Sequence, residues 1–167
     1  MKIFLIGFMG SGKSYWGHKW AAATGMEFMD MDLEIEEQEK LTADEIFAKK
    51  GERYFRELET RFLHNIVSKE NFILACGGGT PCFHDNMEFL NEFGTTIYLR
   101  SAPQNIYQRL VNETEKRPLI KNLQHSELLF YIDQKVKERE AFYLQAKKII
   151  DVDHLPDNFI PELTVNI

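Results

Sequence analysis

The sequence predicts an α/β fold with three layers, in which a five-stranded parallel sheet is flanked by helices. Short apolar segments of strand length alternate along the chain with longer segments of helical periodicity. Parallel strands need crossover connections, so this alternation is typical of a sheet with helices on both faces. The chain has 167 residues, 44% of them hydrophobic, which suffices for one core. We therefore expect a single domain over residues 1–167.

The first predicted strand, residues 3–6, leads into the glycine-rich loop Gly7–Ser14, and a helix is predicted over residues 15–23. Glycine accepts positive φ angles and has no Cβ, so the backbone N–H groups of such a loop can converge on phosphate oxygens. The helix adds free N–H groups and the positive end of its dipole. Together, strand, loop and helix predict a P-loop NTPase-type fold that binds ATP or GTP.

The side chains of this loop have separate expected tasks. Lys13 can reach the β- and γ-phosphates, and the Ser14 hydroxyl can ligate Mg²⁺ directly. A glycine-rich turn that only lets a helix pack closely on a strand would need neither side chain. The predicted nucleotide contacts of the loop are Gly10, Ser11, Gly12, Lys13, Ser14 and Tyr15.

The second predicted strand, residues 27–30, is followed by an acidic pair, Asp30 and Asp32, and a helix is predicted over residues 33–38. In parallel α/β sheets, ligands bind beyond the carboxyl ends of the strands, which makes this pair a candidate site. From the residues alone, the carboxylates can equally complement the dipole of the following helix, an effect of about 0.3 to 1 kcal/mol.

A helix over residues 43–50 is predicted from its two ends. Thr42 and Glu45 have the spacing of a capping box, in which each side chain satisfies a free backbone N–H near the other residue. Gly51 ends the helix, because glycine readily adopts the left-handed conformation that closes helices.

The next helix is predicted over residues 52–68, since its apolar residues recur every three or four positions and form one buried stripe. The stripe consists of Phe55, Leu58, Phe62 and Ile66. Arg56 and Glu59 lie off this stripe, and on the residues alone Arg56 is a surface residue with Glu59 as a nearby partner.

Three further strands are predicted over residues 72–76, 96–99 and 149–152. The first of them runs into the triple glycine Gly77–Gly79. Segment 112–124 is polar, is broken by a proline and carries three cationic residues, Lys116, Arg117 and Lys121. A basic loop of this kind can close over a transferred phosphoryl group, but from the pattern alone a solvated linker is an equal alternative.

Composition excludes several classes of function. The formal net charge of −6 argues against a nucleic-acid or membrane surface, and no apolar run approaches the roughly 20 residues of a membrane span. Cys76 and Cys82 match no zinc or redox spacing and are expected to be reduced thiols. The five histidines form no metal-ligand pattern. We expect a soluble, cytoplasmic protein and a monomer, without nucleic-acid or membrane partners.

Several separated motifs agree with one family, and the chain resembles shikimate kinase over nearly its whole length. The acidic pair, the triple glycine and the late arginine separate this pattern from phosphate-binding domains in general. The motifs that occur in the order and spacing of that family are Gly7–Ser14, Asp30 with Asp32, Phe55–Glu59, Gly77–Gly79, Arg117–Leu119, and Arg139 followed by Phe142, Tyr143 and Ala146.

The resemblance implies transfer of the γ-phosphoryl group of ATP to the 3-hydroxyl of shikimate, with Mg²⁺, in the chorismate route to aromatic amino acids. It implies a mobile lid over about 112–124 and a substrate-binding helical segment over about 32–68. The implied partners are thus two small molecules, shikimate and ATP. The carboxylate and hydroxyls of shikimate require cationic donors at one end of a site and a carboxylate acceptor at the other.

The resemblance also implies residue roles, with Lys13, Asp32 and Arg117 as the catalytic set. Arg56 and Arg139 would bind the shikimate carboxylate, for which a guanidinium fork is better suited than an ammonium. By the same resemblance, Gly77, Gly78 and Gly79 let the shikimate ring approach the backbone closely. Arg117 would bind phosphate, and Asp30 would support Mg²⁺ through water. Glu59 would orient Arg56, and Arg109 would contact the adenine.

Two features depart from the family pattern. Tyr15 stands where a second small hydroxyl residue is usual, and the tail after Val152 makes a full terminal helix doubtful, so Leu155 or Pro156 can border the adenine. Rival functions are a P-loop kinase for gluconate or a nucleoside monophosphate, and an ATP-binding regulator without turnover. A GTPase-like switch is disfavoured, because its guanine-reading and switch motifs are missing from the sequence.

Overall fold

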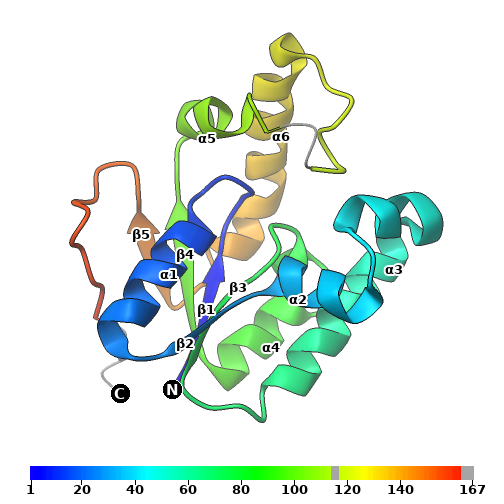
Figure 1. The fold of residues 1–167 in the computed structure, drawn as a ribbon. Coiled ribbons are helices and arrows are strands. Elements are labelled where there is room, and N and C mark those ends of the chain that lie inside the picture. The colour runs from blue at the N-terminus through cyan, green and yellow to red at the C-terminus, as the bar shows by residue number, and fades with distance from the viewer. Residues whose placement is uncertain (114–116, 163–167) are drawn as a thin grey trace.

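The computed structural model describes residues 1–113 and 117–162 and contains a five-stranded sheet in which all strand pairs are parallel. The strand order is β2-β3-β1-β4-β5 (Figure 1). The predicted α/β fold with a parallel sheet is therefore confirmed. In chain order the elements are β1 (Lys2–Ile6), α1 (Lys13–Thr24), β2 (Glu27–Asp30), α2 (Met31–Glu39), α3 (Ala43–Ile66), β3 (Phe72–Ala75), the 3₁₀ helix η1 (Thr80–Cys82), α4 (Asn86–Phe93), β4 (Thr95–Arg100), α5 (Pro103–Leu110), α6 (His125–Tyr143) and β5 (Lys148–Asp151).

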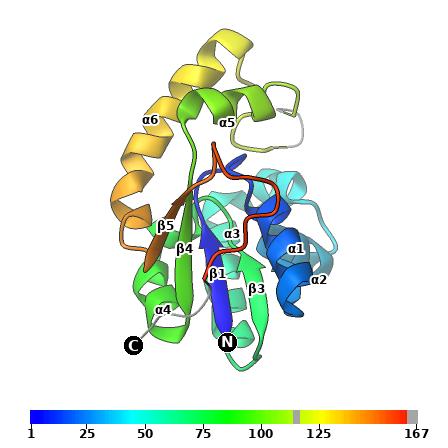
Figure 2. The same cartoon turned by 90° about the vertical axis from the view of Figure 1, so that its left-hand side faces the viewer.

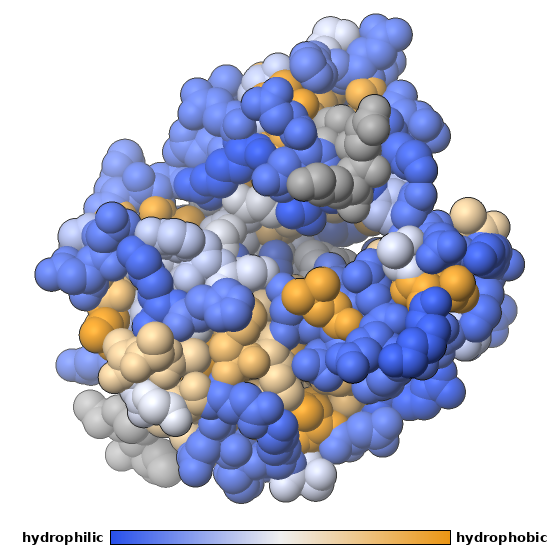
Figure 3. Space-filling view, viewed as in Figure 1, coloured by the Kyte–Doolittle hydropathy of each residue, from blue (hydrophilic) through white to orange (hydrophobic). Residues whose placement is uncertain are grey.

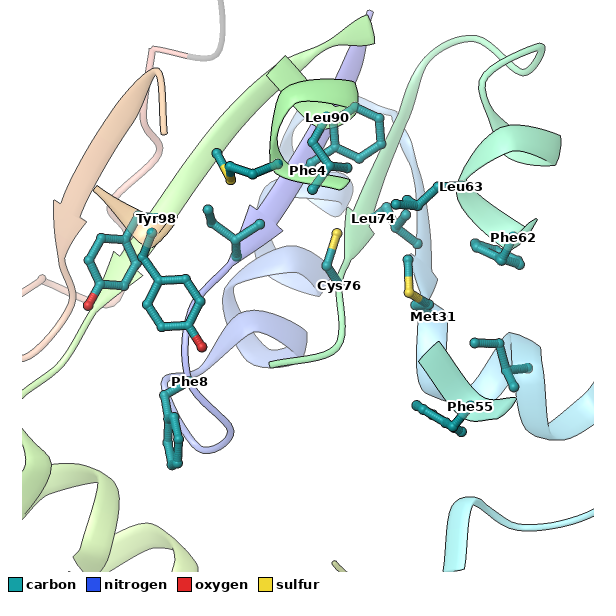
Figure 4. Close-up of a cluster of buried hydrophobic side chains, with 14 of the residues drawn as sticks. Phe4, Phe8, Met31, Phe55, Phe62, Leu63, Leu74, Cys76, Leu90 and Tyr98 are labelled. Atoms are coloured by element: carbon teal, nitrogen blue, oxygen red, sulfur yellow. The ribbon is translucent and has the colours of Figure 1, made fainter. Parts of the chain in front are cut away.

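The side chains of β1 alternate between two hydrophobic clusters, because successive residues of a strand point to opposite faces of the sheet. Ile3 and Leu5 pack in a cluster with Trp16 and Trp20 of α1. Phe4 belongs to the larger cluster on the other face, to which α3, α4, α5 and α6 contribute. Figure 4 shows part of this cluster, with labelled residues of α3 and α4 around Phe4 and Leu74. The helices therefore form layers on both faces, and the strands run from the N-terminus toward α5 (Figure 2).

The β2–α2 junction differs from the prediction by two residues. Strand β2 has the predicted bounds, but α2 begins at Met31 instead of residue 33. The side chain of Asp30 caps this helix by accepting a hydrogen bond from the N–H of Asp32 at 3.2 Å. Asp32 is thus placed in the first turn of a helix, directly beyond the end of the strand.

The capping box and the break at Gly51 are both present in α3. Thr42 Oγ1 accepts from the N–H of Glu45 at 3.2 Å, and the Glu45 carboxylate accepts from the N–H of Thr42 at 2.9 Å. Gly51 has φ 84° and ψ 165°, so the chain turns sharply and then continues as a helix. After this bend, Phe55, Leu58, Phe62 and Leu63 of α3 belong to the larger cluster, together with residues of the sheet.

The predicted lid lies between α5 and α6, and Lys116 falls in residues 114–116, outside the described residues. Lys121 of this segment pairs with Asp44 of α3 at 2.5 Å. The tail from Val152 onward contains no helix up to residue 162, and it is held on α1 by a hydrogen bond from Trp20 Nε1 to the Phe159 carbonyl at 3.0 Å. Within the described residues, no helix has both the length and the apolar character needed to cross a membrane.

Candidate active site

The predicted site residues line one cavity of about 1120 Å³ beyond the carboxyl ends of β1, β2 and β3. Figure 3 shows the surface hollowed beneath the lobe that contains α5. Elements far apart in the sequence meet here, as the topology of a parallel sheet requires. The predicted residues on its lining are Gly10, Ser11, Gly12, Lys13, Ser14, Tyr15, Asp30, Asp32, Arg56, Gly77, Gly78, Gly79, Arg117 and Arg139.

The glycine-rich loop has the backbone conformation that the sequence predicts. Gly7, Gly10 and Gly12 have φ angles of 140°, 76° and 94°, which L side chains rarely adopt. A Cβ on Gly7 would lie 2.7 Å from the carbonyl oxygen of Leu99, so the loop also needs glycine there for space. The loop is therefore shaped to present backbone N–H groups to an anion.

Lys13 is buried and points back at its own loop. Its Nζ donates to the carbonyl oxygens of Gly7 at 2.8 Å and Phe8 at 2.9 Å. Burial lowers the pKa of Lys13 to about 8, and the carboxylate of Asp32 partly offsets this effect. The carbonyl groups carry no full negative charge, so the buried ammonium is suited to bind a phosphate, which does.

Ser14 and Asp30 form a pair suited to a hydrated Mg²⁺ ion. Ser14 Oγ donates to Asp30 Oδ2 at 2.6 Å, so a hydroxyl and a carboxylate, both hard oxygen ligands, lie side by side. Across residues 1–113 and 117–162, no group of three or more His, Cys, Asp or Glu side chains could hold a metal ion by itself. The donor set fits Mg²⁺ that keeps waters and takes further oxygens from a nucleotide.

The carboxyl group of Asp32 has a buried oxygen that is free to accept a hydrogen bond from a ligand. Its Oδ1 is shielded from solvent and has no hydrogen-bond partner among the described residues. Burial raises its pKa to about 7, and the neighbouring carboxylates of Glu59 and Asp30 act in the same direction. A hydroxyl group of a bound substrate would give this oxygen the partner that it lacks.

Arg56 and Glu59 are buried, which excludes the alternative in which Arg56 is a surface helix residue. They are 4% and 0% exposed, and Arg56 Nη1 donates to Glu59 Oε2 at 2.8 Å. Arg56 also donates to Glu52 at 2.9 Å. Both residues leave the apolar stripe because they face the polar cavity, where the ion pair replaces the water that each charge loses. The pair is consistent with the predicted orientation of Arg56 by Glu59.

Arg139 and Arg117 bring positive charge to the cavity that the protein only partly neutralises. Arg139 is 6% exposed, and its buried Nη1 has no hydrogen-bond partner in the part of the chain that the structure describes. Its guanidinium lies 5.5 Å from the ring centroid of Phe8. Arg117 pairs loosely with Glu113 at 3.6 Å, and its Nε likewise lacks a partner among these residues. Both side chains are suited to an anionic ligand.

The triple glycine lets charged side chains contact the backbone closely. A Cβ on Gly77 would lie 2.3 Å from Glu59 Oε1, and one on Gly79 would lie 2.6 Å from Arg56 Nη2. The family resemblance implies that these glycines leave room for the substrate ring. The structure shows a second reason at two of them, because the site's own ion pair occupies the space of a side chain.

Sequence reasoning missed three buried residues that hold this loop. Thr80 Oγ1 donates to Glu59 Oε1 at 2.6 Å, Asn86 Nδ2 donates to the Thr80 carbonyl at 3.0 Å, and Tyr143 donates to the Gly78 carbonyl at 2.5 Å. Tyr143 belongs to the family pattern, but the pattern gives it no role. No local signal marks the other two, since the partner of Thr80 lies 21 positions away and the bond of Asn86 to Thr80 spans an irregular turn and a 3₁₀ helix.

Arg109 lies on the nucleotide-loop side of the cavity. Its Nη1 donates to the carbonyl of Gly10 at 3.0 Å, and its Nη2 pairs with Asp153 at 3.3 Å. Leu155 lines the same cavity, whereas Pro156 is not among its lining residues. Tyr15 turns outward and donates to Asp157 at 2.9 Å, so its ring lies against the tail. The predicted adenine contacts of Arg109 and Leu155 stay predictions.

Comparison with known proteins agrees with this geometry. A family model described as shikimate kinase matches residues 9–165. A shikimate kinase of Bacteroides thetaiotaomicron is 39% identical over 99% of this chain and 94% of its own length. A crystal structure of shikimate kinase from that organism has a TM-score of 0.88 at 40% identity, covering 93% of this chain and 88% of its own. Shikimate kinase from Acinetobacter baumannii in complex with shikimate has a TM-score of 0.84 at 33% identity, covering 94% and 86%. With matches of this extent in sequence and in structure, the chain belongs to the shikimate kinase family.

Proposed function

We propose that this chain transfers the γ-phosphoryl group of ATP to the 3-hydroxyl of shikimate, giving shikimate 3-phosphate and ADP. One observation supports this proposal most directly. The phosphate loop shares its cavity with Asp32 Oδ1 and Arg139 Nη1, an acceptor and a donor that are buried without partners among the described residues. These two groups match the needs of a substrate that carries a hydroxyl and a carboxylate.

On the acceptor side, Arg139 and Arg56 bind the shikimate carboxylate and Asp32 binds the reacting hydroxyl. Arg56 is already fixed by Glu59, so little conformational entropy is lost when it binds an anion. The triple glycine forms the floor of this half of the site. Asp32 aligns the hydroxyl oxygen with the γ-phosphorus and accepts its proton as the new P–O bond forms.

On the donor side, the loop N–H groups and Lys13 hold the phosphates, and Arg117 contacts the transferred group. Ser14 would hold Mg²⁺ directly and Asp30 would hold it through water, a role that fits the 2.6 Å pair between them. When bound, such an ion would supply positive charge beside the phosphates. The bond from the γ-phosphorus to the bridging oxygen breaks, and ADP leaves with the electron pair of that bond.

The alternative is another small-molecule P-loop kinase that acts on gluconate or a nucleoside monophosphate. Such an enzyme would share the phosphate loop and a basic lid but would need a different acceptor site. The match to the shikimate kinase family favours shikimate, since gluconate also carries a carboxylate and hydroxyl groups and would suit the same charges.

We also propose that the protein works as a monomer in the cytoplasm, with ATP and shikimate as its partners. Cys76 and Cys82 are both free thiols, which is typical of proteins in a reducing compartment. Burial raises the pKa of the Cys82 thiol to about 11, so it is protonated at neutral pH and poorly reactive.

A coupled assay of ADP formation tests the proposed reaction. The protein is given Mg²⁺ and ATP with shikimate, gluconate or a nucleoside monophosphate in parallel, and the phosphorylated product is identified by mass spectrometry. We expect turnover with shikimate alone. Faster ADP formation with either of the other acceptors would reject the proposal, and so would ADP formation that does not depend on any acceptor.

A further inference from the structure

The triple-glycine loop is held from below by a tyrosine of α6 that has no role in the proposed reaction so far. Tyr143 is 0% exposed, and its hydroxyl donates to the carbonyl oxygen of Gly78 at 2.5 Å. Burial raises the pKa of Tyr143 well above its ordinary value, so the hydroxyl keeps its proton and stays a donor.

The position of Tyr143 links two parts of the acceptor site. It follows Arg139 by four residues on α6, so both side chains leave the same face of the helix, one turn apart. Gly78 lies between this helix and the phosphate loop, because a Cβ on Gly78 would be 3.6 Å from Arg139 Nη1 and 3.1 Å from the backbone nitrogen of Met9.

The bonded carbonyl also fixes the plane of a peptide unit. The carbonyl of Gly78 and the N–H of Gly79 belong to one planar peptide bond, and the described residues contain no cis peptide bond. An anchor on the oxygen therefore sets the direction of the N–H on the other side. Glycines lack side chains that could do this, so an external anchor matters more here than in an ordinary loop.

We propose that Tyr143 is a positioning residue for the acceptor substrate, whose hydroxyl fixes the Gly78 peptide at a set distance from Arg139. The loop and the guanidinium then form one rigid surface for the substrate. This inference rests on the proposed function, since it assigns Tyr143 to the shikimate half of the cavity and not to the nucleotide half.

A purely structural role would involve the ring more than the hydroxyl. The Tyr143 ring lies 5.0 Å from the ring of Tyr98, a residue of β4 that is 2% exposed (Figure 4 labels Tyr98). Tyr98 donates none of the hydrogen bonds that hold the loop among residues 1–113 and 117–162. The two tyrosines therefore share their packing but differ in the function of the hydroxyl, and Tyr98→Phe is a matched control for Tyr143→Phe.

The experiment measures KM for shikimate, KM for ATP, kcat and thermal melting of the unchanged protein and both variants. For Tyr143→Phe we expect KM for shikimate to rise about three- to tenfold, the effect of one buried hydrogen bond, with KM for ATP within about twofold. Tyr98→Phe should leave both KM values within about twofold. Backbone hydrogen exchange of segment 76–82 should be faster in Tyr143→Phe only.

The outcomes separate this inference from the proposed function. If the unchanged protein does not phosphorylate shikimate, the proposed function fails. If it does, but Tyr143→Phe binds shikimate as tightly as Tyr98→Phe, the positioning role is wrong. Equal rises of both KM values would also overturn it, as would a Tyr143→Phe protein that fails to fold, because the hydroxyl would then serve stability and not substrate position.

Discussion

Two arginines of the acceptor site differ in what surrounds them before any ligand binds. Arg56 is neutralised by Glu59 and Glu52, at 2.8 Å and 2.9 Å. Arg139 has a buried nitrogen without a hydrogen-bond partner among the described residues. Arg56 therefore contributes to the stability of the fold as well as to binding. Arg139 loses contact with water without gaining a full set of partners, which costs folding free energy until a ligand binds.

We predict that Arg139→Ala weakens shikimate binding by about 2 to 5 kcal/mol and leaves ATP binding nearly unchanged, because the substrate carboxylate loses its charged partner in a buried site. Isothermal titration with each ligand measures this. Lys137→Ala, on an exposed position of the same helix, is the matched control and should change neither affinity. Equal losses of affinity for both ligands would argue against the assignment of Arg139.

Arg56→Ala should instead destabilise the fold. It leaves the carboxylate of Glu59 buried and unpaired, for which the expected cost is about 3 to 5 kcal/mol. Denaturant unfolding of Arg56→Ala and Arg139→Ala compares the two directly. A free energy of unfolding that falls equally in both variants would contradict the different surroundings of the two side chains.

Asp32→Asn is predicted to stabilise the fold while it removes activity. Burial raises the pKa of Asp32 from 3.8 to about 7, so the folded state binds more protons than the unfolded state between these values. Stability contributed by this group therefore falls as pH rises through that window. At 1.36 kcal/mol per pKa unit, the gain from asparagine is at most about 4 kcal/mol above pH 7 and vanishes near pH 4.

Denaturant unfolding at pH 8 and at pH 4 measures this difference. Glu37→Gln, an exposed change on the same helix, serves as the control and should stay within about 0.5 kcal/mol at both pH values. A variant Asp32→Asn that is less stable than the unchanged protein at pH 8 would show that the carboxylate is not strained in the folded state.

At the residue scale, sequence reasoning located the charged groups but not their surroundings. Arg56 and Glu59 fall off the apolar stripe of their helix, and only the fold shows that this face meets a cavity. Thr80 has no local feature that marks its bond to Glu59, because twenty-one positions separate the two residues. Contacts of this kind depend on tertiary structure, which periodicity does not contain.

At the scale of elements, the sequence predicts helix ends and breaks correctly where they depend on residues that are close together in the chain. The capping box at Thr42 and the break at Gly51 were both predicted, since each depends on residues a few positions apart. The start of α2 was wrong by two residues because the side chain of Asp30 caps the helix from within the strand. A predicted helix boundary is less accurate where one residue both ends a strand and caps the next helix.

We predict that Gly51→Ala lowers the free energy of unfolding by about 1 to 3 kcal/mol. Nothing lies within 4 Å of the new Cβ, but φ 84° with ψ 165° is a conformation that only glycine adopts readily. Gly25→Ala is a matched control, because it also has free space but a left-handed conformation at φ 71° and ψ 15°. It should cost less, about 1 to 2 kcal/mol. An equal or smaller loss at Gly51 would contradict a strained bend in α3.

At the scale of the whole molecule, an acidic chain still presents cations to the cavity. The formal net charge is −6, and five lining residues, Lys13, Arg56, Arg109, Arg117 and Arg139, are cations that stand beside six acidic ones. Composition alone could not show this, because it averages over the surface. Arg139 Nη1 and Arg117 Nε lack a hydrogen-bond partner among the described residues, and an anionic ligand that pairs with them binds the folded state only, so binding and folding stability are coupled.

This coupling gives the last prediction, which concerns melting of the intact protein. At a ligand concentration of 100 times Kd, binding to the folded state adds about 2.7 kcal/mol, which for a chain of this length corresponds to a rise of roughly 5 to 11 °C in melting temperature. We expect Mg²⁺ with ATP and shikimate each to raise the melting temperature when added separately. Arg139→Ala should reduce the shift caused by shikimate to a third or less and keep the shift caused by ATP. Loss of both shifts in this variant would mean that the two halves of the cavity do not bind independently.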